Sequence, residues 1–108
     1  MDEARSANMF AALGHPNRVR VLRKLVQAGS DGLSVGQLRQ ALGVPASTFA
    51  HHLRALVDAG LILQSRNGRE VMSSVDFEAV GQLAGYLMKD CCAGIPVLET
   101  SLMNQQEA

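Results

Sequence analysis

Apolar residues recur at helical spacing in two short segments, residues 34–43 and 45–58, which predicts two helices joined by a tight turn. In the first segment, Ser34 and Gln37 have the spacing of a capping box, and Gly43 is suited to end the helix. In the second segment, the i, i+4, i+7, i+8 spacing predicts a buried face made of Phe49, Leu53, Leu56 and Val57. The two segments together outline a helix-turn-helix.

The opposite face of the second helix carries short polar or basic side chains and one alanine: Ser47, Thr48, Ala50, His51 and Arg54. Polar and basic groups of this kind hydrogen-bond phosphates and base edges when such a helix lies in a major groove. Similar helix pairs also occur in all-α domains that bind no nucleic acid. A protein-interaction module therefore stays open as an alternative to a DNA-binding protein.

Three more helices are predicted around this pair. The first covers residues 3–13 and the second residues 16–27, whose buried stripe is expected to consist of Val19, Leu22 and Val26, with Val21 and Leu25 beside it. Asp76 can cap a last helix that runs from Phe77 to about Lys89. The first and last helices are the candidate interface of a homodimer.

Two extended segments that follow the helix-turn-helix flank Asn67-Gly68. An Asn-Gly pair in this position is the strongest short signal for a two-residue hairpin turn. A hairpin directly after a helix-turn-helix is a wing, and Arg66 and Arg69 flank its tip, within reach of a minor groove or its phosphates. The predicted fold is mainly α with a small β-hairpin, a winged helix-turn-helix.

Charge is distributed unevenly although the chain has no net charge, with ten Lys and Arg against ten Asp and Glu. Residues 9–69 hold eight basic and two acidic side chains, a balance of +6. Residues 70–108 hold one lysine and six acidic side chains, a balance of −5. This separation allows one basic face to bind phosphates, as expected for a partner that is double-stranded operator DNA.

The length of 108 residues predicts one domain, residues 1–92, with a polar tail over residues 93–108. No apolar run approaches the length of a membrane span, and the N-terminus lacks a signal-peptide pattern, so a cytoplasmic protein without a membrane partner is expected. The three histidines do not join a serine and a carboxylate in a recognisable triad, and no Gly-rich phosphate loop is present. An enzyme is not expected.

Four motifs follow one another along the chain: Ala-Leu-Gly-His-Pro-Asn-Arg at residues 12–18, the segment 47–53, Ala-Gly-Leu-Ile at 59–62 and Arg-Asn-Gly-Arg at 66–69. Over residues 9–92 the sequence resembles the ArsR/SmtB family of winged-helix metalloregulatory repressors. The resemblance implies a homodimer that binds a pseudo-palindromic operator and leaves it when an inducer binds. It also implies that the residues that face DNA are Ser47, Thr48, Ala50 and His51. Here Ala50 and His51 depart from the serine and glutamine frequent in the family, which leaves the operator sequence open.

Two inducer sites of that family do not match this chain. The arsenic site that uses a Cys-Val-Cys sequence corresponds here to Ser34-Val35-Gly36. The zinc site on the last helix corresponds to Asp76, Glu78, Lys89 and Cys92, and a lysine repels a cation. We expect no zinc at that site.

Cys91 and Cys92 resemble the Cys-Cys pair at the end of the last helix in another arsenic-responsive branch of the family. As(III), Sb(III) and organoarsenicals are thiophilic, and thiolate is the ligand such soft centres select. Joint ligation by adjacent residues requires the helix to end there, and we expect Gly94 and Pro96 to supply that ending. No third cysteine follows, so a remaining ligand would be water, hydroxide, an organic group or a group of the partner chain.

Two other accounts of the cysteine pair stay open. The thiols can serve as a redox switch through a disulfide or a persulfide. They can also be two small apolar residues that close a helix.

Overall fold

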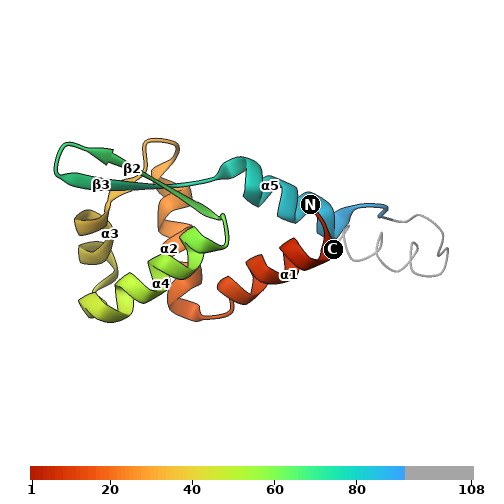
Figure 1. The fold of residues 1–108 in the computed structure, drawn as a ribbon, viewed down its shortest axis with the longest axis horizontal. Helices are drawn as coiled ribbons and strands as arrows, with labels where there is room; N and C mark the ends of the chain where they lie inside the picture. Colours follow the sequence, from red (N-terminus) through yellow and green to blue (C-terminus); the bar gives the residue numbers. More distant parts are fainter. Residues whose placement is uncertain (92–108) are drawn as a thin grey trace, which may run out of the picture.

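The computed structural model describes residues 1–91. In chain order its elements are α1 (Glu3–Ala12), α2 (Pro16–Ala28), β1 (Leu33–Ser34), α3 (Val35–Leu42), α4 (Ala46–Asp58), β2 (Ile62–Asn67), β3 (Glu70–Val75) and α5 (Phe77–Met88). Figure 1 shows the wing and the α3–α4 pair at one end of the molecule and the α1–α5 pair at the other. This is the predicted winged helix-turn-helix, with α3 and α4 as the helix pair and β2 and β3 as the wing.

The predicted starts and ends of α3 are confirmed. The Ser34 hydroxyl accepts from the Gln37 N–H at 3.1 Å, and the Gln37 side chain accepts from the Ser34 N–H at 2.9 Å, which completes a capping box. Gly43 follows the helix with φ 67°, a left-handed conformation that glycine adopts without the steric cost of a side chain.

The sheet contains one strand more than the predicted hairpin. Its order is β1-β3-β2, and both pairings are antiparallel, with Leu33 opposite Ser73 and Ile62 opposite Val75. Gly32 precedes β1 with φ 70°, and a Cβ placed there would lie 2.0 Å from the Ser73 carbonyl oxygen. A glycine is required at this point because β1 approaches β3 so closely.

The wing turn lies one residue later than predicted. Asn67 pairs with Glu70, so it is the last residue of β2, and the two central residues of the turn are Gly68 and Arg69. Among the described residues outside glycine, Asp90 alone has a positive φ, whereas Gly68 has φ 65°. A glycine at the first central position is the arrangement of a type II′ turn, which needs one left-handed residue and not two. The prediction of Asn67-Gly68 as the turn is therefore wrong.

The core combines one face from each helix with the start of β2 and the end of β3. The predicted buried face of α4 is confirmed for Phe49, Leu53 and Leu56, while Val57 is half-buried. In α2 the prediction is wrong for Val19, which is exposed, and for the centre of the stripe: Val21 and Leu25 are buried, while Leu22 and Val26 are partly buried against the core. The reason is tertiary, because α2 turns the Val21–Leu25 side toward α3, α4 and β3.

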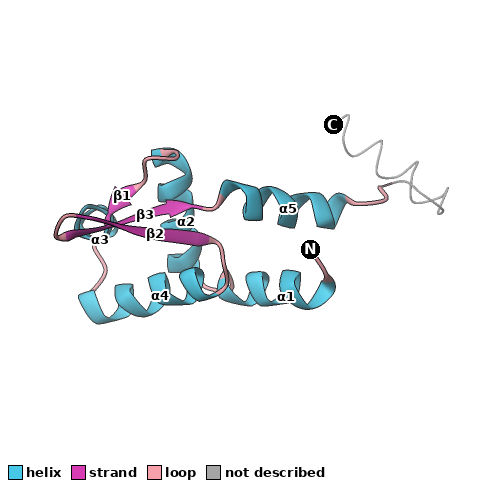
Figure 2. Cartoon of the chain, turned by 45° about the horizontal axis from the view of Figure 1, so that its top comes forward, coloured by secondary structure: helices cyan, strands magenta, loops and turns pink. Residues whose placement is uncertain are grey.

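Helices α1 and α5 lie side by side in both ribbon views (Figures 1 and 2). Their shared contribution to the core includes Met9 from α1 and Leu83 from α5. Large apolar side chains remain exposed on the same two helices, at Phe10, Phe77, Leu87 and Met88. In residues 1–91 no helix is long and apolar enough to cross a bilayer.

Candidate nucleic-acid interface

Helix α4 presents the polar face expected of a recognition helix. All five predicted positions on it are exposed: Ser47, Thr48, Ala50, His51 and Arg54. The helix starts after Pro45, which has φ −57° and ψ 146° and provides no side-chain cap. The first N–H groups of α4 are therefore left without the side-chain acceptor that a Ser or Asp cap would supply, and such groups attract anions.

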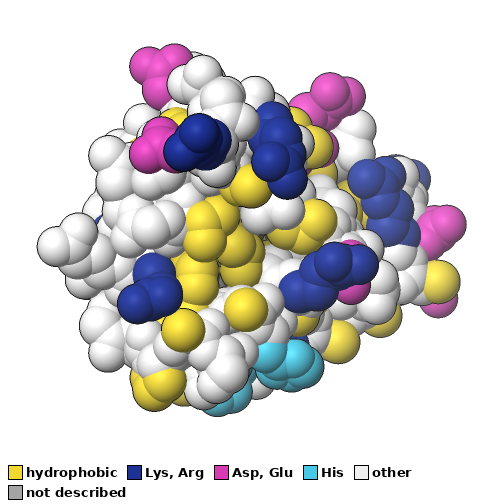
Figure 3. Space-filling view, turned by 60° about the vertical axis from the view of Figure 1, so that its left-hand side comes forward, with side chains coloured by type: hydrophobic (Ala, Val, Ile, Leu, Met, Phe, Trp, Pro, Cys, Tyr) yellow, Lys and Arg dark blue, Asp and Glu magenta, His cyan; other side chains and the backbone are white. Residues whose placement is uncertain are grey.

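The wing adds two exposed arginines beside this helix pair. Arg66 is in β2 opposite Val71, and Arg69 is in the turn at the tip; both are exposed. In Figure 3, Lys and Arg side chains surround a hollow whose floor is hydrophobic. Basic groups around one open depression favour the binding of phosphates there, while Glu70 on the same wall adds one negative charge.

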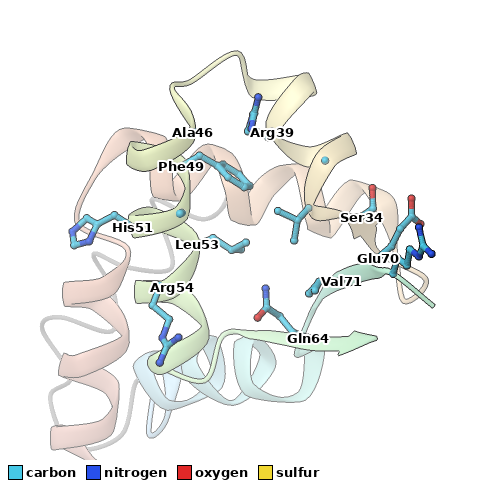
Figure 4. A pocket seen from close by; sticks show the side chains of 14 residues that line it. Ser34, Arg39, Ala46, Phe49, His51, Leu53, Arg54, Gln64, Glu70 and Val71 are labelled. Carbon is cyan, nitrogen blue, oxygen red and sulfur yellow. The ribbon is translucent and has the colours of Figure 1, made fainter. Parts of the chain in front are cut away.

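The hollow is a groove of about 970 Å³ between α3, α4 and the wing. Its walls bring together four of the predicted site residues: Ala50, His51, Arg54 and Arg69. Ser47, Thr48 and Arg66 do not line it. Figure 4 shows Phe49 and Leu53 on the α4 side of this groove, with Gln64 and Val71 of the wing across from them.

Four polar residues that line the groove were not among the predicted site residues: Ser34, Arg39, Gln64 and Glu70. Arg39 comes from the last turn of α3, and Gln64 comes from β2. The Gln64 amide donates to the Ser73 hydroxyl on the neighbouring strand at 3.2 Å. The sequence shows Arg39 only as one of the basic residues of the segment 9–69, because no local pattern indicates that its side chain lies beside the wing.

Among residues 1–91, Arg54 is the arginine of this surface that forms an ion pair. Arg54 Nε lies 3.0 Å from Asp58 Oδ1, one turn further along α4, and both side chains are mostly exposed. An exposed pair at i, i+4 is worth only about 0.3–0.5 kcal/mol. The pairing therefore leaves Arg54 able to exchange Asp58 for a phosphate.

Two histidines next to this helix face have structural roles. His15 caps α2, because its Nδ1 accepts from the Asn17 N–H at 3.1 Å. His52, in the middle of α4, is 4% exposed and packs inside. Arg18 Nε donates to His52 Nδ1 at 3.0 Å. Burial, followed by the charges of His15, Arg18 and His51, lowers the pKa of His52 below 6.5.

The first cysteine of the pair lies just beyond α5. The helix ends at Met88, Asp90 has φ 60°, and the Cys91 N–H donates to the Met88 carbonyl at 3.0 Å. Cys91 is exposed. Helix α5 therefore ends before Cys91. The expectation that Gly94 and Pro96 end this helix is wrong.

The second cysteine of the predicted metalloid site, Cys92, lies outside the described residues. Gly94, Pro96 and the tail over residues 93–108 lie outside them too. Within residues 1–91 no three His, Cys, Asp or Glu side chains are grouped so that they could hold a metal ion. Asp76, one of the positions that correspond to the zinc site of the family, is the cap of α5, where its Oδ1 accepts from the Ala79 N–H at 3.0 Å.

Comparison with known proteins agrees with this geometry. A family model described as a helix-turn-helix domain matches residues 13–64. The HTH-type transcriptional regulator YgaV of Escherichia coli is 33% identical over 87 residues, which are 81% of this chain and 86% of YgaV. An ArsR-like transcriptional regulator from Rhodococcus superposes with a TM-score of 0.73 and 28% identity over 97% of this chain and 93% of that one. The chain belongs to the ArsR family of winged helix-turn-helix transcriptional regulators.

Two further solved structures resemble this ArsR-family regulator. The transcriptional repressor BigR from Xylella fastidiosa is 29% identical, with a TM-score of 0.61 over 81% of this chain and 86% of BigR. The homodimeric DNA-binding domain Mb0332 from Mycobacterium bovis is 25% identical, with a TM-score of 0.65 over 79% of this chain and 76% of that one.

Proposed function

We propose that this ArsR-family regulator is a homodimeric repressor that binds operator DNA through α4 and the wing. The observation that supports the proposal most directly is the common groove: Ala50, His51 and Arg54 of α4 line one depression together with the wing-tip Arg69, and all four are open to solvent. With α4 in a major groove, the wing would lie along the adjacent backbone. Arg66 and Arg69 would then bind phosphates or the minor groove.

Within this proposal the two kinds of contact have different roles. Ser47, Thr48 and His51 would meet base edges, and Ala50 would present a methyl group to a thymine methyl. Arg54 and the wing arginines would bind the backbone, which gives affinity without sequence preference. His51 is the contact expected to give this operator a different base preference from those read by a glutamine at the same position, because an imidazole has one donor when neutral and two when protonated.

Dimerisation would use the apolar surface that α1 and α5 leave uncovered. Phe10, Phe77, Leu87 and Met88 are exposed there, with Phe10 at 41% and Leu87 at 61%. Gly81 and Gly85 on α5 have open space where a Cβ would be, so a helix of a second copy could approach closely. A two-fold axis at this end would present two α4 helices to successive half-sites of an operator.

Release from the operator is proposed to follow binding of As(III), Sb(III) or an organoarsenical to the thiolates of Cys91 and Cys92. In support, Cys91 is exposed and follows the end of α5, beside the proposed dimer surface. A bound metalloid would change the end of the interface helix and so the spacing of the two α4 helices. A thiol redox or persulfide switch at the same pair is the second candidate, since an exposed thiol is also open to oxidation.

The inducer proposal is tested by fluorescence anisotropy of the reduced protein on DNA from its own promoter. Arsenite and then phenylarsine oxide are titrated, with zinc and peroxide in parallel. Release by an arsenical at about one equivalent per monomer is expected, and Cys91→Ser and Cys92→Ser should each keep DNA binding and lose that release. Release by peroxide alone would favour the redox switch, and unchanged release in either serine variant would remove the cysteines from the account.

A further inference from the structure

Arg18 joins three helices through one guanidinium group. It is half-buried on α2, and its Nε donates to His52 Nδ1 in the middle of α4 at 3.0 Å. Its Nη1 donates to the Ala12 carbonyl, the last residue of α1, at 3.4 Å. The contact crosses 34 positions of sequence, so it fixes how α4 sits relative to the first two helices.

The hydrogen bond defines the protonation state of His52. A guanidinium can only donate, so His52 Nδ1 is the acceptor and the ring proton is on Nε2. Nε2 is buried and, among the described residues, has no hydrogen-bond partner. A buried donor without a partner costs about 1–3 kcal/mol, which a packing role alone would not require. A leucine would fill the same space without that cost.

The groups around the ring all favour the neutral form. These are the His15 ring at the N-cap of α2, with its centroid 4.4 Å from that of His52, and Arg18 of α2. From α4 it is the His51 ring at 6.1 Å, while Asp58, the acidic group of that helix, is paired with Arg54. From α1 the Ala12 carbonyl is already engaged by Arg18. No carboxylate among these neighbours compensates a second proton on His52, in agreement with its lowered pKa.

We propose that Arg18 and His52 are positioning residues for operator binding: the bond between Arg18 and the neutral His52 ring holds α4 in the orientation in which His51 and the rest of its exposed face meet DNA. The inference rests on the proposed function, because it assumes that α4 is the recognition helix. His51 and His52 are adjacent, so a rotation of α4 that moves one side chain moves the other. The bond to Ala12 extends the same control to α1, which belongs to the proposed dimer surface.

Acid should break this arrangement. A proton added to His52 Nδ1 would face the Arg18 N–H, so the bond would be replaced by two opposed donors and two like charges. The pKa of His52 in the folded protein is below the ordinary 6.5. The stabilisation is therefore complete above 6.5 and is lost as the pH falls through the lowered folded value.

The test is a pH profile of operator affinity, from about pH 7.5 to about pH 5.5, for the full chain and three variants. His52→Asn keeps an acceptor close to the position of Nδ1 and does not titrate. It should bind within about twofold of the wild type at the higher pH and lose the acid-dependent weakening. His52→Leu should bind about tenfold more weakly throughout. His51→Asn removes a proposed DNA contact, so its affinity should fall at every pH, but it should retain the acid-dependent weakening because the bond between Arg18 and His52 is intact.

Circular dichroism and sedimentation of each variant establish that it is folded and has the oligomeric state of the wild type. A folded His52→Leu protein with wild-type affinity would overturn the proposal, as would a wild-type pH profile in His52→Asn. If His52→Leu does not fold, the profile of His52→Asn decides. Failure of the wild type to bind promoter DNA is a different result, because it would reject the recognition role of α4 itself.

Discussion

Arg54 and Asp58 form an ion pair one turn apart on the exposed face of α4, with Nε and Oδ1 separated by 3.0 Å. In the proposed complex this arginine approaches a phosphate, so the carboxylate of Asp58 approaches it too. The pair contributes little to stability at such exposure. Its main effect is therefore expected on DNA binding, because Asp58 competes with the phosphates for Arg54 and its negative charge repels them.

Asp58→Asn should raise operator affinity by about threefold to tenfold, because it removes a carboxylate near the DNA and releases Arg54. Anisotropy titrations at constant salt measure the change. Asp31→Asn is the control, since Asp31 is exposed in the loop before β1 and, among residues 1–91, forms no ion pair with a basic side chain. Equal affinities for Asp58→Asn and the wild type would show that Arg54 does not meet the backbone.

Arg69→Ala should weaken DNA binding and reduce the slope of log affinity against log salt by about one, the loss of one phosphate contact. Arg23→Ala is the matched control, because Arg23 is an exposed arginine of α2 that does not line the groove. Salt titrations of the three proteins separate the effects. A slope that is the same for Arg69→Ala and the wild type would place the wing tip away from the phosphates.

Leu87→Asp should convert the protein to a monomer in sedimentation velocity and lower operator affinity, since a carboxylate would be buried in the proposed α1–α5 interface. Leu63→Asp is the control: Leu63 is also exposed, at 53%, but lies on β2. This variant should keep the oligomeric state of the wild type. A Leu87→Asp protein that still dimerises would move the interface elsewhere.

Gly32→Ala should lower the free energy of unfolding by about 3 kcal/mol, because the new Cβ would lie 2.0 Å from a backbone oxygen of β3 at a positive φ. Gly43→Ala is the comparison. Gly43 also has a positive φ, but open space surrounds it, so only the backbone cost of about 1 kcal/mol is expected. Urea unfolding measures both. Similar losses for the two variants would mean that β1 moves away from β3 without cost.

Features with local causes could be predicted from the sequence. The Ser34–Gln37 capping box, the Asp76 cap and the start of α2 at His15-Pro16 each depend on residues within three positions of one another. The exposed face of α4 could be predicted from helical spacing for the same reason. The residues of this face make up most of the α4 part of the candidate site.

Features set by distant neighbours could not be predicted in this way. The apolar residues of α2 form two adjacent stripes, and the packing of α3, α4 and β3 decides that Val21 and Leu25 are inside. Strand β1 is two residues long and exists through its pairing with β3. The wing turn lies one residue later than the Asn-Gly pair predicts, because the pairing of β2 with β3 sets the register of the hairpin. The bond between Arg18 and His52 likewise joins residues 34 positions apart.

The central claim is that α4 and the wing bind operator DNA, and the most direct test is the affinity of the reduced wild-type protein for its own promoter. Anisotropy is measured on labelled promoter DNA and on scrambled DNA of equal length, from about 50 to about 200 mM salt. The account predicts tighter binding to the promoter at every salt concentration, with log affinity falling linearly as log salt rises. Absence of binding, or equal and salt-independent binding to both DNAs, would contradict it and leave the winged helix as a protein-interaction module.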